Sequence, residues 1–257
     1  MTTTLAVANQ KGGVAKTTSV ASIGAALAEL GQRVLLVDLD PQACLTFSLG
    51  IDPEDLEVSV HHVLTKGTDP GEVIIETEDG VHLLPATIEL ARAEADLLTR
   101  TGREHVVKMV VEDVEDDYDW VLLDCPPSLG VLTVAALTAA RGVLIPLQCE
   151  TLSHRGVGQL LDTVHDVRKF TNRKLEVWGV LPTLYDGRTN HSRTVLETIA
   201  ETYELEVVEP PIPKTIKFAE ASAAGRSILA TSRTSKGAQA YREVAANLVT
   251  RAGRKKR

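Results

Sequence analysis

The sequence predicts a doubly wound α/β domain, in which helices flank both faces of a mostly parallel, twisted sheet. Short aliphatic runs typical of strands alternate with longer helical patterns from one end of the chain to the other. Hydrophobic residues make up 44% of the 257 residues and aromatic residues only 4%, so the core must consist mainly of Val, Ile, Leu and Ala. We expect residues 1–250 to form one domain and residues 251–257 a basic, polar, mobile tail.

Local patterns predict the elements in chain order. Strands are short, aliphatic or β-branched, and bounded by Gly, Pro or charged residues. A hairpin that turns at Glu78–Gly80 is expected to add an edge to the sheet. The predicted strands are Thr4–Ala8, Arg33–Asp38, Val73–Glu76, Val81–Leu84, Trp120–Asp124, Gly142–Pro146 and Val177–Leu181, and the predicted helices are Thr17–Leu30, Ile88–Leu98, Val131–Ala139, His154–Phe170, Ser192–Tyr203 and Ser235–Val249.

Composition and charge argue against several classes of protein. No apolar stretch reaches the length of about 18 residues that spans a bilayer, and the N-terminus enters a strand without the features of a signal peptide. Cys44, Cys125 and Cys149 lack metal-binding spacing, so we expect no disulfide framework, no zinc site and a cytoplasmic location. The net charge of −8 argues against a cationic coat but leaves room for a local basic face.

The most informative segment joins the first predicted strand to the first predicted helix and has the sequence ANQKGGVAKTT at residues 8–18. A Gly-rich loop in this context binds phosphate, because its backbone N–H groups combine with the positive end of the helix dipole. Lys16 is expected to reach the β- and γ-phosphates of a nucleotide, and the Thr17 hydroxyl to ligate Mg²⁺. The alternative is a Gly-rich turn between two solvated lysines. The expected nucleotide-binding residues of the loop are Lys11, Gly12, Gly13, Val14, Ala15, Lys16, Thr17 and Thr18.

The loop departs from the ordinary Walker A pattern. Gln10 and Ala15 stand where that pattern has glycine, and an extra lysine, Lys11, opens the loop. It resembles the deviant Walker A loop of the ParA/MinD family of P-loop NTPases, and the resemblance covers nearly the whole chain. The resemblance implies an ATPase that uses ATP and Mg²⁺ and dimerises around ATP, with Lys16 in its own subunit's site and Lys11 reaching the partner's nucleotide. Since alanine replaces the glycine that most members carry, we expect a negative φ at Ala15.

Two carboxylates lie at the end of the second predicted strand, in the segment DLDPQ at residues 38–42. The carboxyl ends of parallel strands border the crevice in which α/β sheets bind ligands. The resemblance implies that Asp40 orients or activates the attacking water and that Asp38 supports the Mg²⁺ ligands. Considered without the phosphate loop, the two residues are more typical of a plain turn at the end of a strand.

Two further segments match the same family. The strand Trp120–Asp124 resembles a Walker B strand and would deliver Asp124 to the nucleotide, where it would hold Mg²⁺ through a coordinated water. The DCPPS turn at residues 124–128 is similar to the family segment that senses the γ-phosphate. Residues 210–221 resemble the family's IPxxxxxxEA segment, whose start packs against adenine, so Pro213 is the expected adenine contact.

Three kinds of function compete for this scaffold. We favour an ATPase that binds DNA without sequence preference and drives chromosome or plasmid partition, or cargo positioning, with a ParB-like activator. The alternative is a MinD-like membrane-associated ATPase, but the apolar stripe of the last predicted helix fits packing onto the sheet, so no membrane contact is expected. The third is a metabolic or redox enzyme, for which matching cysteine ligands or a discrete glutaminase domain would be expected.

The DNA-partition hypothesis requires a basic face. By the resemblance, Arg188 falls where ParA proteins carry a DNA-contacting arginine, and Lys217 falls near a second such position. Lys214 and Arg226 are expected to extend this face. Contacts of this kind reach phosphates, so binding would depend strongly on salt and ignore base sequence. The protein would then associate with the nucleoid when ATP is bound.

Overall fold

The computed structural model describes residues 2–150, 153–187 and 190–254. Within these residues the centre of the molecule is one seven-stranded sheet with the order β3-β4-β2-β5-β1-β6-β7. Neighbouring strands are parallel except for β3, which forms the predicted antiparallel hairpin with β4. The predicted fold class is confirmed. The strands are β1 (Thr3–Val7), β2 (Val34–Asp38), β3 (Ile75–Glu76), β4 (His82–Leu84), β5 (Trp120–Asp124), β6 (Gly142–Gln148) and β7 (Glu176–Thr183).

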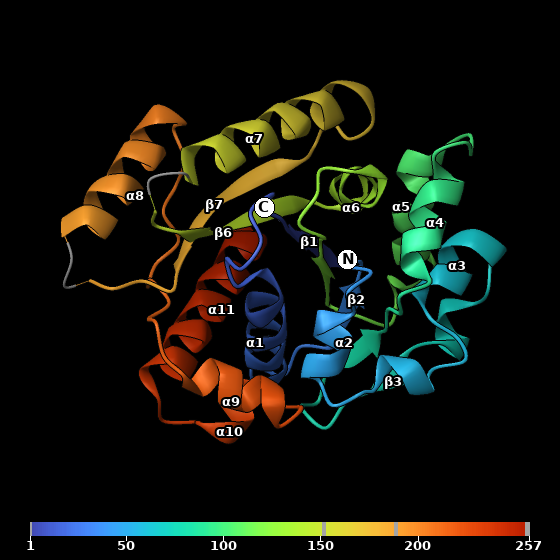
Figure 1. Cartoon of the computed structure of the whole chain (residues 1–257), viewed down its shortest axis with the longest axis horizontal. Coiled ribbons are helices and arrows are strands. Elements are labelled where there is room, and N and C mark those ends of the chain that lie inside the picture. Colours follow the sequence, from blue (N-terminus) through green and yellow to red (C-terminus); the bar gives the residue numbers. More distant parts are fainter. Residues whose placement is uncertain (1, 151–152, 188–189, 255–257) are drawn as a thin grey trace.

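Helices cover both faces of the sheet (Figure 1), because successive strand residues point to opposite sides. Leu5 and Val7 of β1 belong to a core shared with α1, α2, α9, α10 and α11. Ala6 belongs to the core on the other face, shared with α3 to α8. The helices are α1 (Lys16–Glu29), α2 (Cys44–Ser48), α3 (Val60–Lys66), α4 (Leu90–Leu97), α5 (Val106–Val114), α6 (Val131–Ala139), α7 (Ser153–Phe170), α8 (Asn190–Thr202), α9 (Lys217–Ala223), α10 (Ile228–Thr231) and α11 (Lys236–Arg254), with single 3₁₀ turns at Pro53–Asp55, Pro70–Glu72 and Arg103–His105.

The last helix packs beside the first (Figure 1), and its apolar stripe is buried in the core on that face of the sheet. Tyr241, Val244, Ala245 and Leu248 are 0–2% exposed. The Tyr241 hydroxyl lies 3.0 Å from that of Ser19 on α1. No helix in the described ranges has the length and apolar character needed to cross a membrane.

The predicted boundary of the tail is wrong. Helix α11 continues to Arg254, so residues 251–254 are helical, and residues 255–257 lie outside the described ranges. Arg251 holds the helix end in place by donating to the Trp178 carbonyl at 2.8 Å and to the Glu206 carboxylate at 2.7 Å. Its guanidinium also lies over the Trp178 ring, 5.5 Å from the ring centroid.

The order of the strands brings three important strand ends together. Strand β5 lies between β1 and β2, and Asp124 at its end is in register with Val7 on one side and Asp38 on the other. The loop after β1 therefore leaves the sheet beside two buried carboxylates. Because all three strands are parallel, these groups share the carboxyl edge of the sheet, where α/β domains bind ligands.

Candidate functional site

The loop between β1 and α1 has the backbone of an anion-binding site. Gly13 has φ of 74° and Ala15 has φ of 62°, and both values lie in the left-handed region. Alternation of left- and right-handed residues turns successive N–H groups toward one side and makes a concave site for an anion. The loop ends at the N-terminus of the 14-residue helix α1, whose positive dipole end favours the same ligand.

Ala15 contradicts the negative φ that we expected from its side chain. Its φ of 62° and ψ of 36° are left-handed, a conformation in which a Cβ crowds the backbone. The residue is held there from the helix side, since its carbonyl accepts a hydrogen bond from the Ser19 N–H at 3.0 Å. The tertiary structure therefore imposes at Ala15 a conformation that glycine adopts without strain.

Replacing Ala15 by glycine should stabilise the protein without nucleotide by about 1 kcal/mol, because the left-handed strain disappears while glycine's greater freedom in the unfolded chain offsets part of the gain. Urea unfolding with circular dichroism measures this difference. Glycine at Ala26, in the middle of α1, is the control and should destabilise by about 1 kcal/mol. An Ala15→Gly protein that is less stable than the wild type would contradict the left-handed assignment.

Two side chains, Asn9 at the start of the loop and Thr183 far along the chain, anchor the loop, and the sequence analysis missed both. The Asn9 amide donates to the Pro146 carbonyl at 2.7 Å, and its carbonyl oxygen accepts from the Lys11 N–H at 3.0 Å. The Thr183 hydroxyl, at the end of β7, donates to the Val14 carbonyl at 2.9 Å. A polar residue directly after a buried strand was the only signal for Asn9, and no local pattern marks Thr183.

The two lysines of the loop have different surroundings. Lys16 is 7% exposed and its Nζ lies 3.5 Å from the Lys11 carbonyl oxygen. Burial lowers the pKa of Lys16, and the negative charges of Asp124 and Asp40 oppose this effect. Lys11 lies nearer the surface and pairs with Glu150 of the same chain, with 2.5 Å between Nζ and Oε2. Lys16 is therefore a desolvated cation inside the site, and Lys11 a cation at its rim.

Asp124 is the most unusual group of the site. It is fully buried, and neither carboxylate oxygen accepts a hydrogen bond of ordinary geometry from the described residues, although the Thr17 hydroxyl lies close enough to stabilise the charged form. Burial raises the pKa of Asp124 well above its usual range and the charge of Asp38 raises it further, while Thr17 and Lys16 act in the opposite direction. A buried carboxylate without a donor is costly, so the position is suited to a group that binds a cation or its water ligands.

Asp38 and Asp40 both accept hydrogen bonds that shape the segment after β2. Asp38 Oδ2 accepts from both the N–H (2.9 Å) and the hydroxyl (2.8 Å) of Thr46, and Oδ1 accepts from the Asp40 N–H at 3.1 Å. Burial is the main reason that the pKa of Asp38 is raised to about 6. Asp40 is 9% exposed, and its Oδ1 accepts from the Gln42 N–H at 3.0 Å. Asp38 thus holds the turn that presents Asp40, and Thr46 is a contributor that the sequence analysis missed.

The residues present fit a magnesium ion that keeps most of its water. No cluster of three or more His, Cys, Asp or Glu able to cage a metal occurs in the described part of the chain. Magnesium does not require one, because it binds through one or two carboxylates together with phosphate oxygens and waters. The unpartnered Asp124 carboxylate and the nearby Thr17 hydroxyl provide such a donor set, whereas both oxygens of Asp38 already accept protein hydrogen bonds.

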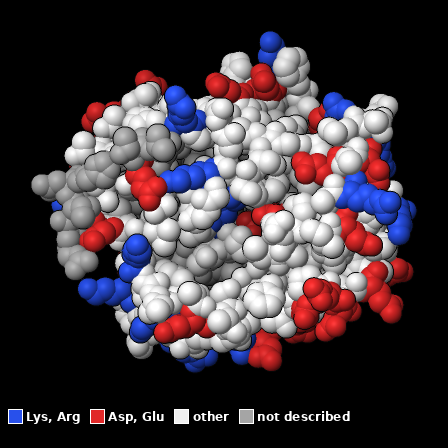
Figure 2. All heavy atoms as spheres, viewed as in Figure 1, with Lys and Arg blue, Asp and Glu red and all other residues white. Residues whose placement is uncertain are grey.

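The residues expected to contact DNA do not all remain available. Lys214 and Lys217 are exposed, next to Pro213, which is half-buried and bridges to Tyr185 beyond the end of β7. On the side of the molecule that Figure 2 shows, basic side chains lie at the lower left, beside α9, and acidic side chains lie at the lower right, around β3. Arg188 lies outside the described residues.

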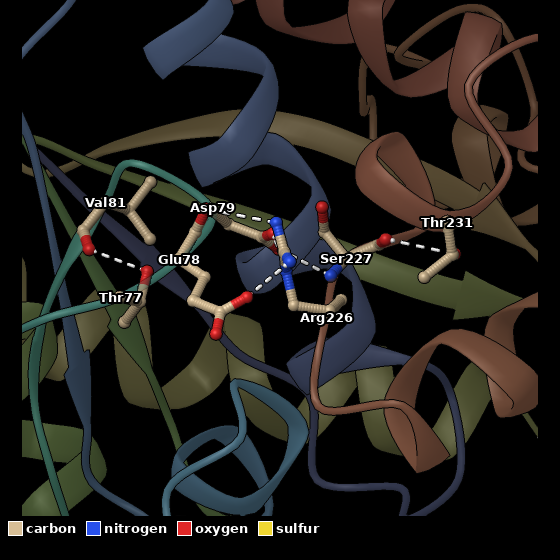
Figure 3. A network of polar contacts seen from close by, with 7 residues as sticks. All are labelled: Thr77, Glu78, Asp79, Val81, Arg226, Ser227 and Thr231. Carbon is tan, nitrogen blue, oxygen red and sulfur yellow. Dashed lines mark hydrogen bonds and ion pairs between the residues drawn. The ribbon is translucent and has the colours of Figure 1, made fainter.

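Arg226 has a structural role instead of the one expected (Figure 3). Its Nε donates to Asp79 at 2.6 Å, one terminal nitrogen donates to the Glu78 carboxylate at 2.5 Å, and the other donates to the Glu78 carbonyl at 3.1 Å. The Asp79 side chain is 2% exposed and also accepts from the Ser227 N–H. The arginine therefore clamps the β3–β4 turn to the α9–α10 turn, and two carboxylates already compensate its charge.

Arg226→Ala should lower the free energy of unfolding by about 2 kcal/mol, because it leaves the buried Asp79 carboxylate without its charged partner. Arg242→Ala is a matched control: Arg242 is 33% exposed like Arg226, but its partner Glu29 is 41% exposed. That variant should lose less than about 1 kcal/mol. Equal losses in urea unfolding would show that the burial of Asp79 has no energetic importance.

Comparison with known proteins follows the same lines as the geometry. A family model described as an AAA domain matches residues 2–177. The sporulation initiation inhibitor protein Soj of Bacillus subtilis is 43% identical, with 95% of this chain and 98% of Soj covered. The chromosome-partitioning ATPase Soj of Thermus thermophilus is 42% identical, with 96% and 95% covered.

A solved structure is also similar over the whole chain. It is described as cobyrinic acid a,c-diamide synthase from Mycobacterium smegmatis with bound ADP and magnesium, and it has 57% sequence identity and a TM-score of 0.89. The match covers 100% of this chain and 97% of the chain in that solved structure. The phosphate loop, the buried carboxylates beside it and these extended identities lead to one assignment. The chain belongs to the ParA/Soj family of P-loop ATPases.

Proposed function

We propose that the protein is a partition or positioning ATPase that binds Mg-ATP, dimerises around it and then binds DNA without sequence preference. The observation that carries the first step is the pair formed by buried Lys16 and buried, unpartnered Asp124 at a left-handed phosphate loop. Both groups are desolvated without full compensation, which is unfavourable until an anion and a cation arrive together. A magnesium nucleotide supplies both charges.

Each residue of the site has a defined role in this proposal. Lys16 and the N–H groups of residues 12–18 bind the phosphates, and Thr17 and Asp124 hold magnesium and its waters. Magnesium, when bound, neutralises charge that develops on the phosphates during hydrolysis. Asp40 orients the attacking water. Asp38 keeps Asp40 in position by accepting a hydrogen bond from the Asp40 N–H. Pro213 is the proposed contact for adenine.

Dimerisation would use Lys11. In the single chain its ammonium pairs with Glu150, and both side chains are at least 30% exposed, so the pair is weak and can be exchanged. A phosphate of the partner's nucleotide offers Lys11 a stronger, doubly charged acceptor. ATP would then favour the dimer, because it makes contacts there that the monomer lacks.

DNA binding would use the exposed Lys214 and Lys217, together with Arg188. Reversing the charge of both lysines by Lys214→Glu and Lys217→Glu should weaken binding to any DNA sequence. The slope of log affinity against log salt should fall by about four, because the dimer loses two phosphate contacts in each protomer. The control is Lys169→Glu together with Lys174→Glu, which changes the net charge by the same amount. Both of these lysines are exposed and precede the start of β7, at the end of the strand away from Lys214. ATP turnover should stay at the wild-type level in both.

The class of function is tested with Asp40→Ala, which should bind ATP without hydrolysing it and so accumulate the dimer. Sedimentation with DNA and with anionic liposomes, each with and without ATP over a salt series, separates the hypotheses. Retention on DNA only with ATP supports the partition proposal. Retention on liposomes alone would select a membrane-associated ATPase instead. A ParB-like activator with a basic segment is the proposed stimulating partner, measured as faster ATP turnover of the wild type.

A second candidate is an amide-forming ATPase, because a 57% identical structure is described as a cobyrinic acid diamide synthase. Such an enzyme would activate a substrate carboxylate with ATP and transfer nitrogen from glutamine or ammonia. Mass spectrometry of a corrinoid carboxylic acid incubated with ATP, magnesium and each nitrogen donor tests this directly. Amide formation that depends on Lys16 would replace the partition proposal.

A further inference from the structure

A buried hydroxyl at the end of β7 contacts the phosphate loop from 169 residues further along the chain. Thr183 is 0% exposed, and its Oγ1 donates to the carbonyl oxygen of Val14 at 2.9 Å. Val14 is itself 1% exposed. A buried carbonyl that loses its donor costs more than an ordinary hydrogen bond contributes, so this contact is strongly maintained.

The sheet and a neighbouring segment hold Thr183 in a fixed position. It is in register with Gln148 of β6, and it is the last residue of β7. The Pro182 carbonyl accepts from the Ile212 N–H at 2.7 Å, and the Tyr185 N–H donates to the Ile212 carbonyl at 2.9 Å. Hydrogen bonds on both sides of Thr183 therefore leave its backbone little freedom to follow a moving loop.

The position of this contact fixes the direction of a neighbouring N–H group. The Val14 carbonyl and the Ala15 N–H belong to one trans, planar peptide unit, and they point in opposite directions. When Thr183 binds the carbonyl, the Ala15 N–H must therefore point away from Thr183, in the opposite direction within the peptide plane. The next peptide is also held, because the Ala15 carbonyl accepts from Ser19. Both peptides around the left-handed Ala15 are thus secured.

We propose that Thr183 is a positioning residue of the phosphate loop, whose hydroxyl keeps the strained Ala15 left-handed and its N–H directed toward the nucleotide phosphates. The inference rests on nucleotide binding by this loop, as proposed above. It explains how alanine is tolerated at a position where glycine would be free of strain: the contact from β7 replaces the conformational freedom that glycine would have supplied. Thr183 itself does not touch the nucleotide in this scheme. It acts through the conformation of the loop, so its effect is expected in nucleotide binding.

The test combines the two positions. Thr183→Val removes the hydroxyl and keeps the shape, Thr183→Ser keeps the hydroxyl, and each is measured alone and together with Ala15→Gly. Isothermal titration gives the affinity for Mg-ADP, and steady-state assays give KM for ATP and kcat. Thr138→Val is the control, since Thr138 is also buried but donates to Val134 within its own helix α6.

We expect Thr183→Val to weaken Mg-ADP binding and to raise KM about tenfold, with kcat within about twofold of the wild type. Thr183→Ser and Thr138→Val should bind like the wild type. With glycine at position 15, which adopts the left-handed conformation unaided, Thr183→Val should cost only about twofold.

Three results would overturn the proposal. They are wild-type affinity in Thr183→Val, an equal tenfold loss with and without Ala15→Gly, and a tenfold loss in Thr183→Ser. The serine variant keeps the test decisive if the valine variant does not fold. Failure of the wild type to bind Mg-ADP would instead refute the proposed function. Urea unfolding without nucleotide would then still test the role of Thr183. We expect Thr183→Val to lower the free energy of unfolding less in the Ala15→Gly background than in the wild type.

Discussion

Replacing Lys16 by methionine is expected to weaken ATP binding by at least about 100-fold, on the order of 3 kcal/mol. Methionine keeps an apolar stem that can stay buried at a position only 7% exposed, so the change removes little more than the ammonium group. In the proposed complex that ammonium is a desolvated partner of the β- and γ-phosphates, and a hydrogen bond between charged groups is strongest in such surroundings. Titration of a fluorescent ATP analogue with magnesium measures the loss.

The control for Lys16 is Lys236→Met, which removes an exposed ammonium at the start of α11 and should leave the affinity unchanged. Circular dichroism of both variants without nucleotide shows that each is folded. If the Lys16 variant is folded and binds ATP within tenfold of the wild type, the assigned role of Lys16 is wrong. The carboxylates around it would then have to be explained without a nucleotide.

Asp124→Asn is expected to remove most of the contribution of magnesium to nucleotide binding. Wild-type affinity should be at least about tenfold higher with magnesium than with a chelator, because the ion links the phosphates to a carboxylate that has no described hydrogen-bond donor. Asparagine has the same shape but no charge to attract the ion. Affinities for ATP measured with magnesium and with EDTA should therefore become nearly equal in the variant.

Asp119→Asn is the matched control for Asp124→Asn. It removes the carboxylate that directly precedes β5, at the end of the strand opposite Asp124. Asp119 accepts from the backbone and guanidinium of Arg33, far from the phosphate loop in the sheet register. That variant should keep the full magnesium effect. A magnesium effect of wild-type size in Asp124→Asn would show that the ion is held elsewhere.

Prediction of the elements succeeded where the periodic signal was strong and failed where charge obscured it. Helix α5 was missed, although its buried residues Val106, Val107, Val110, Val111 and Val114 have helical spacing. The acidic residues at 112–119 overlap the end of this helix and obscure its apolar face in the sequence pattern. The short helices α2 and α9, with five and seven residues, have too few turns for a periodic pattern to be recognised.

Single side chains were predicted less well than motifs. Arg226 was expected on a basic face because its charge was counted without its neighbours. Its partners Glu78 and Asp79 lie almost 150 residues earlier in the chain, so only the folded structure brings them together. The position of Lys11 at the rim, beside Glu150, also depends on a contact across 139 residues.

The sequence by itself determined the parallel sheet, the phosphate loop with its two lysines, and the carboxylates at the ends of β2 and β5, because each depends on residues close together in the chain. The tertiary structure alone decided the left-handed conformation of Ala15, the isolation of Asp124, the clamp formed by Arg226, and the contact from Thr183. These features depend on which distant groups meet in the folded core, where burial and the supply of hydrogen-bond donors set the energy of each group. A pattern of neighbouring residues contains no information about that supply.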